Sequence, residues 1–137
     1  MDNICEKITE EGLVIPIYKP TNWTSFDIVK YVRGVFKKHT QFKKIKVGHA
    51  GTLDPLATGL LIVCVGKKTK EIYKYQDQKK TYIATFKLGA TTPSYDLETN
   101  INETFSTSHI NIDLIKETIK DFLGDSEQIP PAFSALK

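Results

Sequence analysis

The sequence predicts an α+β fold, a mixed, mainly antiparallel sheet flanked by helices. Strand-like apolar runs alternate along the chain with segments that have the spacing of an amphipathic helix, and no repeat or linker divides them. The chain has 137 residues, 40% hydrophobic and 26% charged, which suits one compact domain or a piece of a larger one. The last segment stops without a capping element, so we expect a fold that is truncated at its C-terminus.

The first half is expected to contain a strand and a helix. Residues 13–18 are strand-like, and Pro16 favours an edge position or a bulge because proline cannot donate to a ladder. Thr24 or Ser25 can then cap a helix that runs to about Lys38. The apolar face of this helix is expected to hold Phe26, Val29, Val32 or Arg33, and Phe36.

Further elements are expected after a basic loop and a glycine-rich loop. The continuous apolar run 60–65 predicts a buried strand, and a short helix is expected over 69–75. Residues 80–88 alternate in polarity, which predicts a strand with Tyr82 on its apolar face. The remaining segments are a polar loop over 89–108, a helix capped by Asn111 or Asp113 that runs to Leu123, an extended stretch over 128–131 and the start of a strand over 133–137.

The chain is mildly basic, with a net charge of +3 and a pI near 8.8. This charge is compatible with a polyanionic partner, and the distribution of the lysines says more than their total. The lysines form two groups, which are either solvated faces or patches that neutralise RNA phosphates. The first group is Lys37, Lys38, Lys43, Lys44 and Lys46, and the second is Lys67, Lys68, Lys70, Lys74, Lys79 and Lys80.

The cysteines and histidines do not form a pattern that predicts a disulfide or metal site. Cys5 and Cys64 are too few for a disulfide framework, and together with the three histidines they lack metal-ligand spacing. The N-terminus has no signal-peptide pattern, and no apolar stretch reaches membrane-spanning length. We therefore expect a reduced, cytoplasmic protein without a metal or a membrane partner.

The segment around Asp54 has the character of a presented loop. Taken alone, Asp54-Pro55 is an ordinary turn pair, in which the carboxylate caps the turn. However, proline restricts the residue before it, so Pro55 fixes the backbone that carries the Asp54 side chain. The loop also leads directly into the buried strand 60–65, which would give it a rigid foundation. Three glycines allow turns and a close approach of a bulky polyanion: Gly48, Gly51 and Gly59.

Residues 48–59, GHAGTLDPLATG, resemble the signature motif of the TruB family of tRNA pseudouridine-55 synthases. The resemblance extends from about Gly12 to the last residue and implies the pseudouridine synthase catalytic fold. Residues 1–11 are then an N-terminal extension, and residues 12–137 are the N-terminal portion of the catalytic domain. The companion motifs are Lys19-Pro20 with Thr24-Ser25, Gly66 to Lys70, Lys80-Thr81-Tyr82, Gly89 to Asp96, and Gln128 to Lys137. Asn22 replaces a glycine that is usual in the family, and asparagine tolerates the positive φ of such a turn.

The resemblance implies an enzyme that isomerises the T-arm uridine of tRNA (uridine-55) to pseudouridine without a cofactor. Asp54 would be its essential carboxylate, and attack on the sugar, attack on the base and assisted elimination remain open as its role. In the family an arginine from the C-terminal half partners this carboxylate, whereas Arg33 is the only arginine here. A catalytically incomplete RNA-binding fragment is therefore the alternative. An unrelated stand-alone domain is the third reading.

The resemblance also implies roles for other residues. Tyr82 would stack on the target uracil and help the late proton removal, although a tyrosine on an apolar strand face usually belongs to a core. His49 would pack near the flipped nucleotides, and Lys19 would support the active-site loops. The positions expected to bind or support the bound RNA are His49, Gly51, Thr52, Lys19, Lys80 and Asp96. The expected partner is the tRNA T arm, and we expect a monomer.

Overall fold

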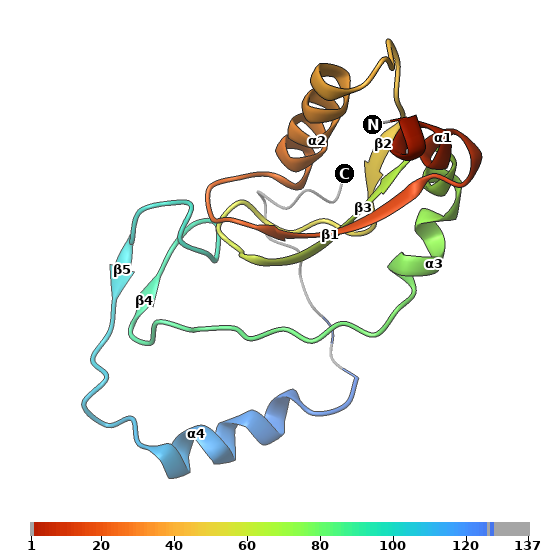
Figure 1. The fold of residues 1–137 in the computed structure, drawn as a ribbon. Coiled ribbons are helices and arrows are strands. Elements are labelled where there is room, and N and C mark those ends of the chain that lie inside the picture. The colour runs from red at the N-terminus through yellow and green to blue at the C-terminus, as the bar shows by residue number, and fades with distance from the viewer. Residues whose placement is uncertain (1, 126, 128–137) are drawn as a thin grey trace. The chain divides into compact units, whose positions relative to one another are not determined.

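The computed structural model describes residues 2–125 and 127 (Figure 1). The chain forms two compact units, residues 1–81 and 82–137. The α+β class is confirmed, since small antiparallel sheets and helices make up both. The extended stretch and strand expected within 128–137, and the family motif there, lie outside the described residues. No helix in the described part of the chain is both long and apolar enough to cross a membrane.

The first unit contains a three-stranded antiparallel sheet with the strand order β1-β3-β2. Strand β1 (Leu13–Lys19) pairs along its whole length with the central strand β3 (Gly59–Val65), which also pairs with β2 (Val47–His49). Both long strands were predicted from the sequence. Pro16 lies on β1, at the edge of this sheet, where its missing N–H costs no ladder bond.

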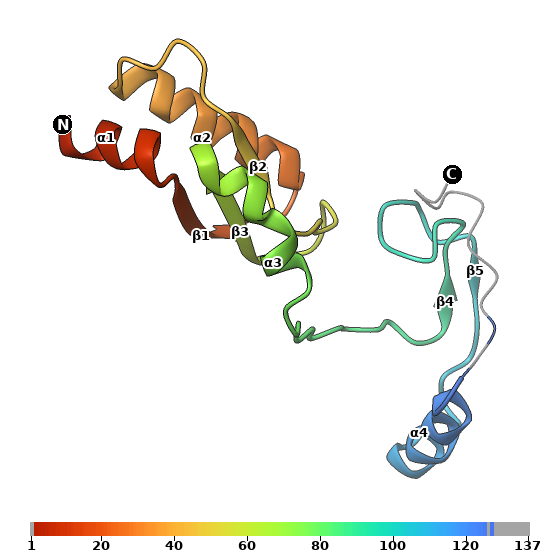
Figure 2. The ribbon, with the colours of Figure 1, turned by 90° about the vertical axis from the view of Figure 1, so that its right-hand side faces the viewer.

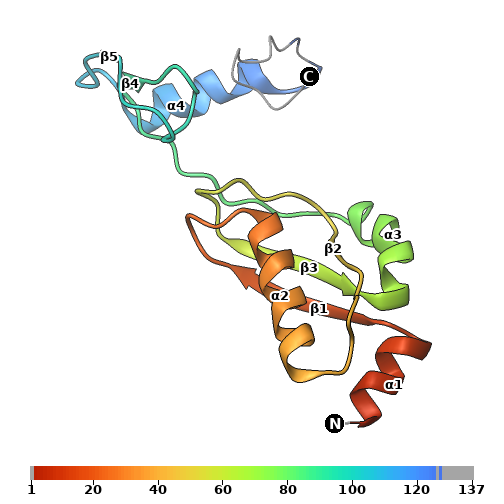
Figure 3. The ribbon, with the colours of Figure 1, turned by 90° about the horizontal axis from the view of Figure 1, so that it is seen from above.

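Helix α2 (Ser25–His39) covers one face of the sheet, as the view from above shows (Figure 3). The predicted helix is confirmed, and so is most of its expected apolar face, since Val29 and Val32 are buried and Phe36 packs against the core. Only the expectation for Phe26 is wrong. Phe26 is 53% exposed, with the ammonium group of Lys30 5.0 Å from its ring centre, whereas Ile28 is buried. The core holds Ile8, Ile28, Val29, Val32, Val47, Leu61, Val63 and Val65.

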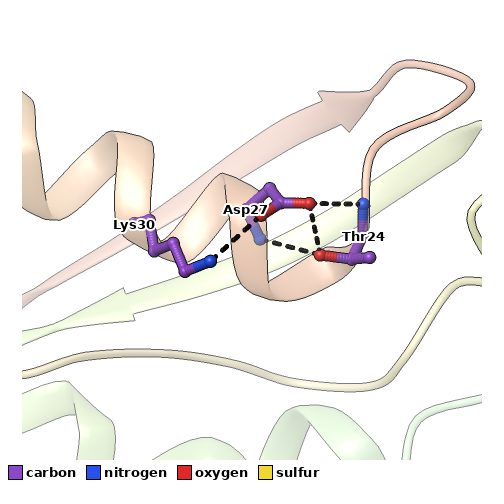
Figure 4. Close-up of polar contacts among 3 residues, drawn as sticks. All are labelled: Thr24, Asp27 and Lys30. Carbon is purple, nitrogen blue, oxygen red and sulfur yellow. Dashed lines mark hydrogen bonds and ion pairs between the residues drawn. The ribbon is translucent and has the colours of Figure 1, made fainter.

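A capping box starts α2 at Thr24 (Figure 4). The Thr24 Oγ1 accepts the Asp27 N–H at 3.1 Å, and the Asp27 Oδ2 accepts the Thr24 N–H at 3.1 Å and its hydroxyl at 2.6 Å. Lys30 lies 3.4 Å from the other carboxylate oxygen. These bonds favour the ionised form, so the hydroxyl of Thr24 first, and then its N–H, lower the pKa of Asp27.

Helix α1 (Asp2–Glu10) and the 3₁₀ helix η1 (Gly66–Glu71) pack together beside the sheet, next to helix α3 (Ile72–Gln76) (Figure 2). Helix α1 was not predicted, whereas η1 and α3 together cover the short helix expected over 69–75. Gly66 has a φ of +65°, and a Cβ on it would lie 2.7 Å from the Ile8 carbonyl oxygen. Only glycine allows α1 to approach η1 this closely.

The second unit contains β4 (Ala90–Thr91), β5 (Glu103–Thr104), α4 (Ile112–Ile119) and the short 3₁₀ helix η2 (Lys120–Phe122). The predicted cap is confirmed, since the Asn111 side chain accepts the N–H groups of Asp113 and Leu114. The strand expected over 80–88 is wrong, because these residues form no regular structure. An alternating segment becomes a strand only against a partner, and none of the described strands pairs with it.

Candidate active site

The loop that carries Asp54 connects β2 to β3. At its start the Ala50 N–H donates to the Ile62 carbonyl at 2.8 Å, which continues the pairing beyond β2. The loop returns to the sheet at Gly59, the partner of Lys19 on β1. Gly51 and Gly59 have φ values of +112° and +147°, which residues with a Cβ rarely adopt. The loop therefore stands at one end of the sheet, between the turn after β1 and the start of β3.

Lys19 ties this loop to the turn after β1. Its side chain is fully buried, and its Nζ donates to the carbonyls of Pro20 at 3.0 Å, Trp23 at 2.6 Å and Pro55 at 3.3 Å. An ammonium group has three donors, so all of them are used. This geometry fits the expected support of the loop and leaves no exposed Nζ for RNA contact.

A second set of contacts holds the residues on both sides of Asp54. The buried Ser25 hydroxyl accepts the Leu53 N–H at 2.9 Å and donates to the Leu53 carbonyl at 3.2 Å. The Asn22 N–H donates to the Pro55 carbonyl at 2.8 Å. Asn22 has a φ of +62°, which confirms the turn expected where the family has glycine. From the sequence, Ser25 was predicted only as a possible N-cap of the helix. A helix needs only one capping hydroxyl, and Thr24 and Ser25 offer two. The second hydroxyl is the signal in the sequence that could have pointed to a contact elsewhere.

The Asp54 side chain is exposed, and its carboxylate has no hydrogen-bond partner within residues 2–125 and 127. The turn is closed instead by backbone, since the Ala57 N–H donates to the Asp54 carbonyl at 3.1 Å. The ordinary reading of Asp54 as a turn cap is therefore not what the structure contains. The loop presents a carboxylate on a backbone that is fixed before and after it.

His49 shapes the beginning of the loop. Its Nδ1 lies 2.5 Å from the Gly51 carbonyl oxygen. A carbonyl can only accept, so Nδ1 carries a proton and Nε2 is left for another partner. Gly51 is half-buried and Thr52 is exposed. His49, Gly51 and Thr52 thus belong to the N-terminal part of the loop, before Asp54.

Members of both lysine groups meet at one pocket of about 300 Å³. The Gly66 N–H donates to the Lys46 carbonyl at 2.9 Å, which brings the two segments together. The pocket lies at the Val65 end of β3, whereas the Asp54 loop lies at the Gly59 end. The seven residues of β3 separate the two ends by about 20 Å. The lining residues are Ile8, Phe42, Lys44, Ile45, Lys46, Gly66, Lys67, Thr69 and Lys70.

Two other expected site residues lie at the boundary of the units, Lys80 near the end of the first and Tyr82 at the start of the second. The Lys80 ammonium group donates to the carbonyls of Gln76 and Gln78. Tyr82, in the second unit, is 73% exposed. Both side chains are exposed, so neither belongs to the core of its own unit.

Asp96 belongs to a hydrogen-bonded turn of the second unit. Its Oδ1 accepts the Ser94 hydroxyl at 2.6 Å and the Glu98 N–H at 2.9 Å. The Ser94 hydroxyl first, and then the Glu98 N–H, lower the pKa of Asp96. Within the described residues, no group of three or more histidine, cysteine or acidic side chains is placed to hold a metal ion.

Comparison with known proteins gives matches over nearly the whole chain. The family described as "TruB family pseudouridylate synthase (N terminal domain)" matches residues 37–137. The chain is 55% identical over 128 residues to "tRNA pseudouridine synthase B" of Bacteroides fragilis, covering 93% of the chain and 55% of that protein. The protein of the same name from Flavobacterium johnsoniae is 56% identical over 128 residues, 93% of the chain and 56% of that protein. The chain thus spans about half the length of the curated relatives it matches.

Proposed function

The chain belongs to the TruB family of pseudouridylate synthases, and from this we propose that its protein isomerises uridine-55 in the T arm of tRNA to pseudouridine. The reaction breaks the bond between the ribose and a ring nitrogen, turns the base, and joins the ribose to a ring carbon. The nitrogen gains a proton and the carbon loses one, so no electrons are gained or lost overall. The chemistry therefore needs no redox cofactor.

Asp54 is proposed as the essential carboxylate. A carboxylate can stabilise or trap an electron-deficient sugar carbon as the base leaves, as it does in glycoside hydrolysis. The observation that carries the proposal is the exposed Asp54 side chain, which has no hydrogen-bond partner among the described residues and stands on a backbone fixed by Lys19, Asn22 and Ser25. Such preorganisation is what a reacting group requires.

The remaining roles follow from the family resemblance. Tyr82 is proposed to stack on the target uracil and to help the late proton removal, and its 73% exposure supports a role outside a core. His49, Gly51 and Thr52 are proposed to contact the flipped nucleotide and its backbone, with the Nε2 of His49 open to a partner. Lys80 and Asp96 are proposed as further RNA contacts.

The pocket lined by Lys44, Lys46, Lys67 and Lys70 is proposed to contact RNA phosphates. The target uridine lies inside a folded arm, and its extrusion costs a few kcal/mol that contacts elsewhere must offset. These lysines have no ion-pair partner among the described residues. Their pocket stands about 20 Å from the Asp54 loop along β3, so it can reach a different stretch of the backbone.

Residues 12–137 are proposed as the N-terminal portion of the catalytic domain and residues 1–11 as an extension, occupied largely by α1. The protein is proposed to act as a cytoplasmic monomer, with tRNA as its partner and without a metal.

A catalytically incomplete RNA-binding fragment is the second candidate. The observation that favours it is the position of Arg33, which donates to the Val47 carbonyl at 3.4 Å and so is occupied away from the loop. An exposed carboxylate that must stay ionised beneath bound RNA needs a cationic partner. In the family that partner comes from the C-terminal half of the catalytic domain.

Pseudouridine formation in an unmodified T-arm stem-loop tests both candidates. The 137-residue chain, its Asp54→Asn variant and the chain extended by its genomic continuation are compared. Activity in the extended protein alone, lost with Asp54→Asn, supports the synthase and makes the shorter chain an incomplete catalyst. Activity in the shorter chain removes the fragment candidate. An inactive extended protein that still binds the stem-loop overturns the synthase proposal.

A further inference from the structure

We propose that Ser25 is a positioning residue for the reaction at Asp54, because it fixes the peptide group that leads into this residue. The proposal rests on the proposed function for its catalytic part and on the geometry alone for its structural part. Ser25 is the first residue of α2 and is 2% exposed. Its hydroxyl points to the loop between β2 and β3, twenty-eight residues further along the chain.

One hydroxyl serves both backbone groups of Leu53. It accepts the Leu53 N–H at 2.9 Å and donates to the Leu53 carbonyl at 3.2 Å. The carbonyl of Leu53 and the nitrogen of Asp54 belong to the same planar peptide unit. By donating to this carbonyl, Ser25 fixes the orientation of the peptide plane that precedes the Cα of Asp54.

The peptide unit on the other side of Asp54 is fixed by a different contact. The Asp54 carbonyl accepts the Ala57 N–H at 3.1 Å, and Pro55 restricts the Asp54 backbone further. With both planes fixed, the direction of the Cα–Cβ bond of Asp54 is set, and only its side-chain torsions remain. Ser25 holds the plane on the N-terminal side.

Capping of α2 does not explain the Ser25 contacts. Thr24 already caps the helix through its reciprocal bonds with Asp27. Leu53 also packs its side chain against the core of the first unit, so Ser25 joins the loop to the helix at an anchored residue. The Thr24 hydroxyl therefore caps α2, and the Ser25 hydroxyl binds Leu53. Removing each hydroxyl in turn gives a matched pair of variants.

The test uses the full-length protein with the variants Ser25→Ala and Thr24→Ala. Each removes one hydroxyl at the start of α2, but only Ser25→Ala frees Leu53. We expect Ser25→Ala to lower kcat about tenfold to a hundredfold, since a small misplacement of a reacting group has an effect of this size. KM should change less than kcat, because the lysine pocket at the far end of β3 is untouched.

Hydrogen exchange at the Leu53 amide is measured in the same proteins. Ser25→Ala should accelerate it at least about tenfold, as expected when a protecting hydrogen bond is lost. Thr24→Ala should lower the melting temperature while leaving both this amide and kcat near their wild-type values. Equal losses of kcat in the two variants, or an unchanged kcat in Ser25→Ala, overturn the proposal.

The two proposals can fail separately. A wild-type protein that makes no pseudouridine overturns the proposed function and with it the catalytic part of this inference. The exchange measurement needs no catalysis, so it still decides whether Ser25 holds the loop.

Discussion

The Nζ of Lys19 lies 3.3 Å from the carbonyl oxygen of Pro55, thirty-six residues further along the chain. This contact joins the end of β1 to the residue that follows Asp54. The same ammonium group also donates to the carbonyl of Trp23. One buried charge thus binds backbone carbonyls of both the turn after β1 and the Asp54 loop. The side chain of Asp54 takes no part in this arrangement.

Lys19→Met is expected to lower the free energy of unfolding by about 1.5–3 kcal/mol, because it leaves carbonyls without the charged donor that satisfied them. Urea denaturation of the full-length protein measures this. Lys30→Met is the control, since Lys30 is exposed and its ion pair with Asp27 lies at the surface, where such pairs contribute little to stability. Equal losses in the two variants would contradict the structural role of Lys19.

Asp54→Asn is expected to lower the rate of pseudouridine formation by more than about a thousandfold, a loss typical of an essential reacting group. Stability and stem-loop binding should be nearly unchanged, because the carboxylate has no hydrogen bond to lose within the described residues. Single-turnover assays and fluorescence anisotropy measure the two effects. Asp77→Asn, at another exposed carboxylate, is the control and should keep full activity.

The double variant Lys44→Ala/Lys67→Ala is expected to weaken tRNA binding and to reduce its dependence on salt. Loss of two phosphate contacts should reduce the slope of log K against log salt by about 1.4 to 1.8. Binding is measured at several salt concentrations. Lys37→Ala/Lys38→Ala removes the same charge outside the pocket lining. An equal change of slope in the two double variants would mean that tRNA binding depends on the net charge of the protein and not on the pocket.

Thr24→Ala is expected to raise the pKa of Asp27 towards its ordinary value of 3.8, because the hydroxyl that lowers it most is gone. A lowered carboxyl pKa contributes stability that is present above the unfolded pKa and is lost as the pH falls through the folded pKa. The wild-type protein should therefore lose this contribution below about pH 4, whereas the variant lacks most of it at every pH. Carboxyl NMR titration follows Asp27 directly, and Ser25→Ala should leave its titration unchanged.

Gly66→Ala is expected to destabilise the packing of α1 by about 1–3 kcal/mol, because the new Cβ would meet the Ile8 carbonyl at a positive φ. Gly34→Ala is the matched control. A Cβ at Gly34 has open space, and alanine favours a helix interior by about 0.5–1 kcal/mol. Thermal unfolding should show opposite shifts for the two variants, and shifts of the same sign would contradict the close approach at Gly66.

Local patterns predicted the first unit well. The apolar run 60–65, the cap at Thr24 and the strand before Pro20 each depend on neighbouring residues, and all three are present in the structure. The positive φ of Asn22 was likewise predictable, because the turn needed it.

Features that depend on distant partners were missed or wrong. The segment 80–88 alternates like a strand, but no described strand pairs with it. The sequence predicts Ser25 only as a possible helix cap, because its contact partner Leu53 lies twenty-eight residues away and no local pattern connects the two. The pocket joins Lys46 to Gly66 through the pairing of β2 with β3, which no local pattern specifies.

Strand β3 carries the Asp54 loop at one end and the lysine pocket at the other. A single inserted residue would lengthen it by about 3.3 Å and send every side chain beyond the insertion to the opposite face, Val63 and Val65 among them. The length of β3 therefore sets the distance between the Asp54 loop and the lysine pocket. Selection on this distance, and on the core that Val63 and Val65 belong to, would act on the same seven residues.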